Sequence, residues 1–269
     1  MKPSTPIRIG AVSYLNTKPL VFGLADRARG ARIEFDLPSR LAAGLAAGRY
    51  DVALIPSIEY FQRPGYSILS DACIACRGPV LSVKLFSRVA PANIRSVALD
   101  EGSRTSAALV RILLQQRFGI TPVTQVLPIG AGADAVRADA VLLIGDRAIH
   151  RPAGEFVAEW DLGDEWCRWA ELPFVFAMWV AREGFEAWEL AGELESARDD
   201  GLAHLEEIAK REAQVVRLPP EVCLTYLRDN LYFYLGTREQ QGLELFRRHA
   251  AGLGLAPAVQ PTCECPDVA

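Results

Sequence analysis

The sequence lacks a long apolar run and lacks any excess of positive charge. Its longest apolar stretches, such as Phe174 to Val180, fall far short of the roughly 20 residues that a membrane-spanning helix needs. The formal net charge at pH 7 is −4. We therefore expect neither a membrane nor nucleic acid as a partner. The first residues also lack the apolar core of a signal peptide, which predicts a cytoplasmic protein.

Histidine is scarce, and the usual catalytic motifs are missing. His150, His204 and His249 are the only histidines, and all three fall in predicted helices or helix ends. No histidine spacing typical of a zinc site occurs, and no serine stands in a Gly-x-Ser-x-Gly turn. We expect no metal and no cofactor. If the protein is an enzyme, positioning and electrostatics must supply most of its catalysis.

Six cysteines are present, in a pattern that leaves two interpretations open. Two pairs stand out, Cys73-x-x-Cys76 and Cys263-x-Cys265. In a reducing compartment such residues are expected to be buried thiols. A four-cysteine zinc site built from the two pairs is the alternative.

What is present is the pattern of an α/β protein. Apolar residues make up 50% of the chain and charged residues 23%, as in ordinary globular domains. Short apolar strands alternate with helices in the first half, which favours parallel sheets with right-handed crossovers. The predicted strands cover residues 8–12, 31–37, 51–55, 79–88, 94–99, 123–127, 140–144 and 172–180. The chain after residue 186 is predicted to be helical, except for the tail after Leu255, which has no periodicity.

This order of elements predicts two lobes. Residues 1–89 and 176–269 would form a discontinuous first α/β lobe that includes the C-terminal helices. Residues 90–175 would form an inserted second α/β lobe. Two chain crossings would then act as a hinge, with a ligand cleft between the lobes.

Polar residues end several predicted strands, where open α/β sheets bind their ligands. Ser13, Tyr14 and Asn16 follow the first strand, and Ser57 follows the third. Gly145 and Asp146 follow the strand at 140–144, where the glycine permits close backbone approach. Turn formation and helix capping are the alternative roles of these residues.

A candidate anion site starts the helix after residue 102. Ser103, Arg104, Thr105 and Ser106 open this helix, whose free N–H groups and partial positive charge suit a carboxylate or a phosphate. Ser103 acting only as a helix cap is the alternative. Ser82 lies between apolar neighbours in a strand, so its hydroxyl needs either a cleft ligand or a backbone carbonyl.

Five short segments, in order along the chain, carry a resemblance to a known family. They are Ile9–Leu20, Ser82–Arg88, Val97–Asp100 with Ser103–Ser106, Leu172–Trp179 and Tyr226–Phe246. In these segments the sequence resembles the chorismate dehydratases of the futalosine route to menaquinone. The resemblance implies a two-lobed fold of the periplasmic-binding-protein type II and dehydration of chorismate to 3-[(1-carboxyvinyl)oxy]benzoate. It also implies that a substrate carboxylate acts as the base and that Asn16 is the catalytic residue.

Two other functions fit the same fold. A solute-binding protein normally requires export, and no signal peptide is visible. A synthase that forms 1,4-dihydroxy-6-naphthoate in the same pathway is associated with a cleft histidine early in the chain, whereas the first histidine here is His150.

Overall fold

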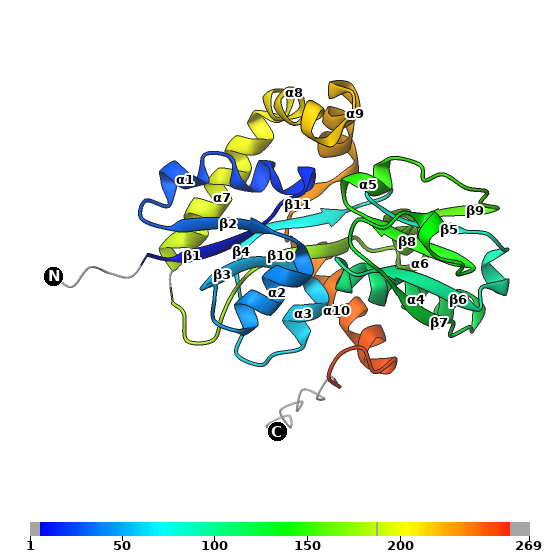
Figure 1. The fold of residues 1–269 in the computed structure, drawn as a ribbon. Helices are drawn as coiled ribbons and strands as arrows, with labels where there is room; N and C mark the ends of the chain where they lie inside the picture. Colours follow the sequence, from blue (N-terminus) through cyan, green and yellow to red (C-terminus); the bar gives the residue numbers. More distant parts are fainter. Residues whose placement is uncertain (1–5, 187, 259–269) are drawn as a thin grey trace, which may run out of the picture.

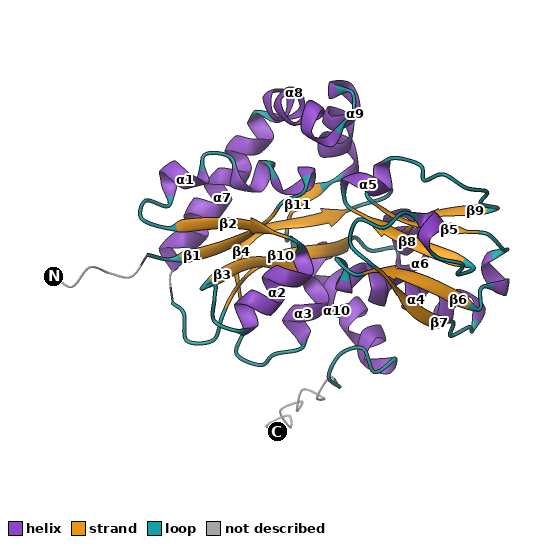
Figure 2. Cartoon of the chain, viewed as in Figure 1, coloured by secondary structure: helices purple, strands orange, loops and turns teal. Residues whose placement is uncertain are grey.

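The chain folds into two lobes, each built around one β-sheet (Figure 1). The structure is a computed structural model that describes residues 6–186 and 188–258. In Figure 2 strands run through the middle of each lobe and helices pack outside them. The first lobe holds a six-stranded sheet and the second a five-stranded sheet.

The sheet of the first lobe has the strand order β11-β4-β10-β3-β1-β2. Strand β1 pairs in parallel with β2 and β3, whereas β10 runs antiparallel to β3 and β4. Its central strands β3 and β10 are buried along their whole length, which is why their sequences are continuously apolar. The strands are β1 (Arg8–Val12), β2 (Arg32–Asp36), β3 (Val52–Pro56), β4 (Ser67–Cys76), β10 (Phe174–Ala181) and β11 (Tyr232–Tyr234).

The sheet of the second lobe has the order β7-β6-β8-β5-β9. Strand β6 pairs in parallel with β7 and β8, and β5 runs antiparallel to β8 and β9. The strands are β5 (Val83–Ser87), β6 (Ser96–Asp100), β7 (Val123–Leu127), β8 (Ala140–Ile144) and β9 (Ala158–Asp161).

Helices cover both lobes and join them. In Figure 1, α7 lies on one side of the first sheet, and α2 and α3 lie on the other. Helix α10 contacts both β10 of the first lobe and α4 of the second. The helices are α1 (Leu24–Arg27), α2 (Pro38–Ala46), α3 (Ser57–Phe61), α4 (Arg104–Phe118), α5 (Asp146–Ile149), α6 (Leu162–Ala170), α7 (Trp188–Ala203), α8 (Leu205–Val216), α9 (Pro220–Thr225) and α10 (Thr237–Gly252).

The chain crosses between the sheets earlier than the sequence suggests. The expected boundary after residue 89 would assign β5 to the first lobe, but β5 pairs only within the second sheet. The sequence predicts one strand from residue 79 to 88. Instead Leu81 takes a positive φ of 59°, which turns the chain just before β5. The return crossing likewise ends two residues before the expected position, because β10 begins at Phe174.

The sequence predicts helix throughout the region after residue 186, and one segment of that region differs from the prediction. Residues Tyr232–Tyr234 form β11, which pairs with β4. Phe233 is buried while its two neighbours are half-buried, so this short segment has the alternation of a strand. Just before it, Tyr226–Asn230 form a π-helix, η5, that continues from α9.

Candidate active site

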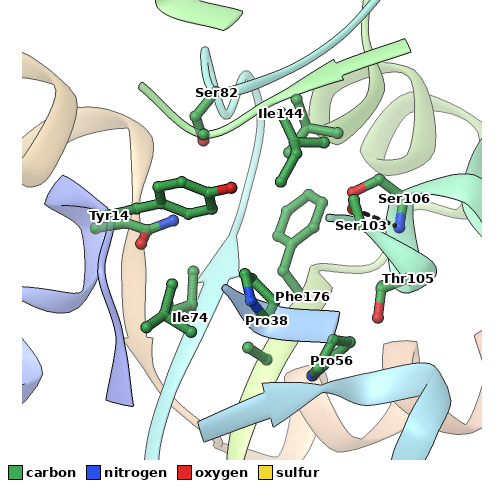
Figure 3. Close-up of a pocket in the computed structure, with 15 residues that line it drawn as sticks. Tyr14, Pro38, Pro56, Ile74, Ser82, Ser103, Thr105, Ser106, Ile144 and Phe176 are labelled. Atoms are coloured by element: carbon green, nitrogen blue, oxygen red, sulfur yellow. Dashed lines mark hydrogen bonds between the residues drawn. The ribbon is translucent and has the colours of Figure 1, made fainter. Parts of the chain in front are cut away.

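A cavity lies where the two sheets meet, with an empty volume of about 460 Å³ (Figure 3). Both lobes contribute to its wall. Within the described part of the chain, none of the lining side chains carries a charge. The lining residues are Val12, Tyr14, Asn16, Pro38, Pro56, Ile74, Ser82, Val83, Ser103, Thr105, Ser106, Ile144, Gly145, Phe176 and Ala177.

The turn after β1 brings Tyr14 and Asn16 to this cavity. Tyr14 precedes a single 3₁₀ turn, Leu15–Thr17, which carries Asn16. The ring of Tyr14 packs against Gly145 of the second lobe, where an added Cβ would lie 2.9 Å from Tyr14 Cζ. Burial, reinforced by the nearby Asp100 carboxylate, raises the pKa of Tyr14. The phenol is therefore neutral at physiological pH and can act as a hydrogen-bond donor.

The start of helix α4 forms the opposite wall. Ser103 is its N-cap, and its Oγ accepts a hydrogen bond from Ser106 N–H at 3.3 Å (Figure 3). The capping role of Ser103 is thus real, but it occupies only one of the free N–H groups of the first turn. Because the cap lines the cavity, the positive end of the α4 dipole faces that space.

Ser82 reaches the cavity from the crossing between the lobes. Its backbone carbonyl accepts a hydrogen bond from Gly145 N–H at 2.9 Å. The preceding turn is held by the carboxylate of Asp161, which accepts from the N–H groups of Val80 at 2.9 Å and Leu81 at 2.7 Å. In Figure 3 the Ser82 side chain points toward the cavity. The crossing therefore presents this hydroxyl from a fixed backbone.

Two of the predicted site residues on the first lobe do not line the cavity. Ser13 is exposed. Ser57 is buried, and its hydroxyl donates to the carbonyl oxygen of Val175 at 2.7 Å. Thr105 does line the cavity, but its Oγ1 accepts a hydrogen bond from Ile58 N–H across the lobes at 3.2 Å.

Arg104 and Asp146 also lie outside the lining, and both connect the two lobes. Arg104 forms an ion pair with Glu59 at 3.0 Å. Asp146 Oδ1 accepts a hydrogen bond from Leu15 N–H at 3.2 Å, and burial raises the pKa of this carboxyl group. Together with the bond from Ile58 to Thr105, these contacts hold the lobes against each other.

The sequence analysis does not identify the apolar part of the lining. Phe176 in β10, Ile74 in β4 and Ile144 in β8 form an apolar surface beside the polar groups (Figure 3). Strand β10 is apolar on both faces, so its sequence gives no signal for which side chains meet a ligand. Apolar and aromatic side chains of this kind line most pockets that bind small molecules.

The described residues contain no cluster of three or more histidine, cysteine, aspartate or glutamate side chains suited to a metal ion. Cys73 and Cys76 are buried in β4, and the Cys167 thiol donates to the carbonyl oxygen of Cys76 at 3.9 Å. Cys263 and Cys265 lie outside the described residues, so the four-cysteine hypothesis remains untested. Every helix in the described ranges is too short or too polar to cross a bilayer.

Solved structures with this fold include solute-binding proteins. Protein AF1704 from Archaeoglobus fulgidus aligns with a TM-score of 0.71 and 16% identity, over 94% of this chain and 99% of that one. The alkanesulfonate-binding protein SsuA from Xanthomonas axonopodis pv. citri aligns with a TM-score of 0.63 and 16% identity, over 96% of each chain. The fold is thus periplasmic-binding-protein-like, as the sequence resemblance implies.

Sequence similarity is more specific than the fold. A protein family described as menaquinone biosynthesis matches residues 7–252. A curated chorismate dehydratase from Thermus thermophilus is 33% identical over 276 aligned positions, which cover 95% of this chain and 99% of that protein. The chain therefore belongs to the chorismate dehydratase family of menaquinone biosynthesis.

Proposed function

We propose that the protein is a carbon–oxygen lyase of the cytoplasm that converts chorismate to 3-[(1-carboxyvinyl)oxy]benzoate and water. The observation that carries this proposal is the likeness to a chorismate dehydratase along nearly the whole length of both chains. The cavity between the lobes adds a site of suitable size and chemistry for a small molecule.

The cavity offers neutral hydrogen-bond donors and an apolar surface. Chorismate carries two carboxylates on a small ring system, and the N-terminus of α4 is a natural place for one of them. Tyr14, Asn16 and Ser82 can donate to the second carboxylate or to the ring hydroxyl. Phe176 can pack against the ring. The carboxylates of the substrate and its ring then each have a matching group in the cavity wall.

The reaction removes one ring proton and the neighbouring hydroxyl group, and the ring becomes aromatic. No histidine, lysine or carboxylate among the described residues lines the cavity, and Tyr14 is held neutral by burial. A carboxylate of the substrate is then the nearest base. Transfer into a cavity with little water raises the pKa of a carboxylate and so makes it a stronger base. Asn16 would orient this carboxylate or the departing hydroxyl.

Closure of the lobes would supply this dry environment. The contacts of Thr105 with Ile58, Arg104 with Glu59 and Asp146 with Leu15 join the lobes around the cavity. They must separate for substrate to enter and re-form around it. A ligand held from both lobes favours the closed state, and closure excludes water from the reaction.

Incubation of the purified protein with chorismate tests the proposal. We expect an aromatic product that is lighter than chorismate by one water, detected by absorbance and mass spectrometry. Chorismate that binds in calorimetry but is recovered unchanged would indicate a binding protein instead. Formation of 1,4-dihydroxy-6-naphthoate from that pathway's own precursor, without turnover of chorismate, would indicate the related synthase.

A further inference from the structure

Tyr226 stands at an unusual point of the backbone. It is the first residue of the π-helix η5 (Tyr226–Asn230), which follows α9. Its side chain is fully buried. Single π-helical turns inside helices are rare and occur frequently at functional sites.

The phenol of Tyr226 is buried without a hydrogen-bond partner among the described residues. A buried hydroxyl without a partner destabilises the folded protein, so such a group needs an explanation. Tyr226 does not itself line the cavity. Any role in the site must therefore act through its neighbours.

Those neighbours are two residues of the cavity wall. Burial is the main influence that raises the pKa of Tyr226, and the nearby Asp146 and Asp161 carboxylates raise it further. The side chains of Ser82 and Asn16 lie close enough to the phenol to lower this pKa in part. Their present orientation gives no hydrogen bond of good geometry to Tyr226. The phenol is thus a neutral group that lies near the side chains of Ser82 and Asn16.

Within the described residues, strong hydrogen bonds fix neither the Ser82 hydroxyl nor the Asn16 amide in one orientation. The Ser82 hydroxyl makes no hydrogen bond within the described residues, and Asn16 Oδ1 accepts only a long one, 3.3 Å, from Thr17 Oγ1. A serine hydroxyl can donate or accept, and an asparagine amide presents an acceptor at one end and donors at the other. An anionic ligand requires that both residues turn their donors toward it.

We propose that Tyr226 is a positioning residue that fixes these orientations. In the ligand-bound state its O–H donates to Asn16 Oδ1 or to Ser82 Oγ. When Asn16 Oδ1 accepts this bond, the asparagine turns its NH₂ group into the cavity; when Ser82 Oγ accepts it, the serine turns its O–H into the cavity. In either case the ligand meets a donor from the residue that Tyr226 engages. The inference rests on the proposed function, because it concerns the same site and the same anionic substrate.

Replacing Tyr226 with phenylalanine removes only the hydroxyl. We expect the kcat for chorismate dehydration to fall about 10- to 100-fold, in the range for loss of preorganised hydrogen bonding in an active site. The melting temperature should stay unchanged or rise, because an unpartnered buried hydroxyl has been removed. Tyr66→Phe is the matched control, since the Tyr66 hydroxyl is also buried without a partner among the described residues but lies outside the cavity lining. It should keep full activity.

A double-mutant cycle tests whether Tyr226 acts through its neighbours. The background for the test is a variant that carries both Ser82→Ala and Asn16→Ala. Because this variant should have little activity, chorismate binding is measured instead, by calorimetry, and adding Tyr226→Phe should no longer change it. In the unmodified background Tyr226→Phe should weaken binding. Equal weakening in both backgrounds would overturn the positioning role.

The remaining outcomes are also decisive. An active protein whose Tyr226→Phe variant keeps full kcat would overturn this inference alone and leave the proposed function standing. A variant that melts well below the wild type would mean that the hydroxyl has a structural partner, and would overturn it as well. A wild-type protein that does not convert chorismate would overturn the proposed function and this inference together.

Discussion

Replacement of Gly145 by alanine tests whether the contact between Tyr14 and the turn after β8 shapes the cavity. Gly145 has φ 68° and ψ −159°, a region that residues with a Cβ rarely adopt. An added Cβ would lie 2.9 Å from Tyr14 Cζ and 3.0 Å from Tyr14 Cε1. The substitution therefore strains the backbone and pushes the ring of Tyr14 away.

The two effects have separate magnitudes. The backbone conformation should cost about 1–3 kcal/mol for a residue other than glycine. Overpacking against the Tyr14 ring should add about 1–3 kcal/mol. The free energy of unfolding should thus fall by about 2–6 kcal/mol, a large share of the roughly 5–15 kcal/mol of a typical domain. Because Tyr14 lines the cavity, chorismate turnover should fall too.

Urea unfolding of four variants separates these contributions: Gly145→Ala, Tyr14→Ala, the two combined, and Gly192→Ala. In a Tyr14→Ala background the ring is gone, so Gly145→Ala should cost only the backbone part. Gly192→Ala is the control: Gly192 lies inside α7 with open space around it, and the alanine should stabilise the protein by about 0.5–1 kcal/mol. If Gly145→Ala costs the same with and without the ring, the steric argument is refuted. An unchanged unfolding midpoint would refute the backbone argument as well.

Three further predictions concern the site and the response to acid. Asn16→Asp places a negative charge beside an anionic substrate and should lower kcat by about 10²-fold without unfolding the protein, whereas full activity would contradict the assigned role. We propose that the Ser106 hydroxyl binds a substrate carboxylate, a hydrogen bond worth about 1.5–3 kcal/mol, so calorimetry of Ser106→Ala should show chorismate binding at least about 10-fold weaker. An unchanged Kd would leave this residue outside the anion site. Burial opposes ionisation of Asp51, but hydrogen bonds from Arg8 and Arg182 prevail and lower its pKa to about 2. The ionised Asp51 should therefore stabilise the folded protein fully above its unfolded pKa of about 3.9, and this stabilisation should be lost as the pH falls toward 2. Urea unfolding at several pH values should show the loss in the wild type, and the Asp51→Asn variant should not show it.

The strand-end argument predicts part of the cavity wall from sequence. Tyr14, Asn16 and Gly145 follow strands, and Ser103 and Ser106 open the helix after β6; all five line the cavity. Their binding roles remain predictions. The argument works here because the carboxyl ends of parallel strands gather at one edge of a sheet, whatever the details of side-chain packing.

Other features depend on tertiary contacts that no local pattern contains. Residues 79–88 have the apolar character of one strand, and the turn at Leu81 exists because the distant Asp161 carboxylate binds its N–H group. Tyr226 belongs to a segment that reads as an ordinary helix, yet the backbone there forms a π-helix. Local propensity cannot register interactions between residues that are far apart in sequence.

A polar residue at a strand end can either face the ligand cavity or bond to another part of the protein, and the sequence alone does not distinguish these two roles. Ser57, Arg104 and Asp146 satisfy the same criterion as the lining residues, but they bond to protein groups instead of facing the cavity. For Arg104 and Asp146 the partner belongs to the other lobe. In a two-lobed protein the strand ends that face the ligand also face the opposite lobe, so contacts that close the lobes and contacts that bind the ligand come from the same positions. A polar strand end therefore marks the region where the lobes meet, although Ser13 is exposed outside the cavity. The division between ligand contacts and closure contacts follows only from the three-dimensional partners of each side chain.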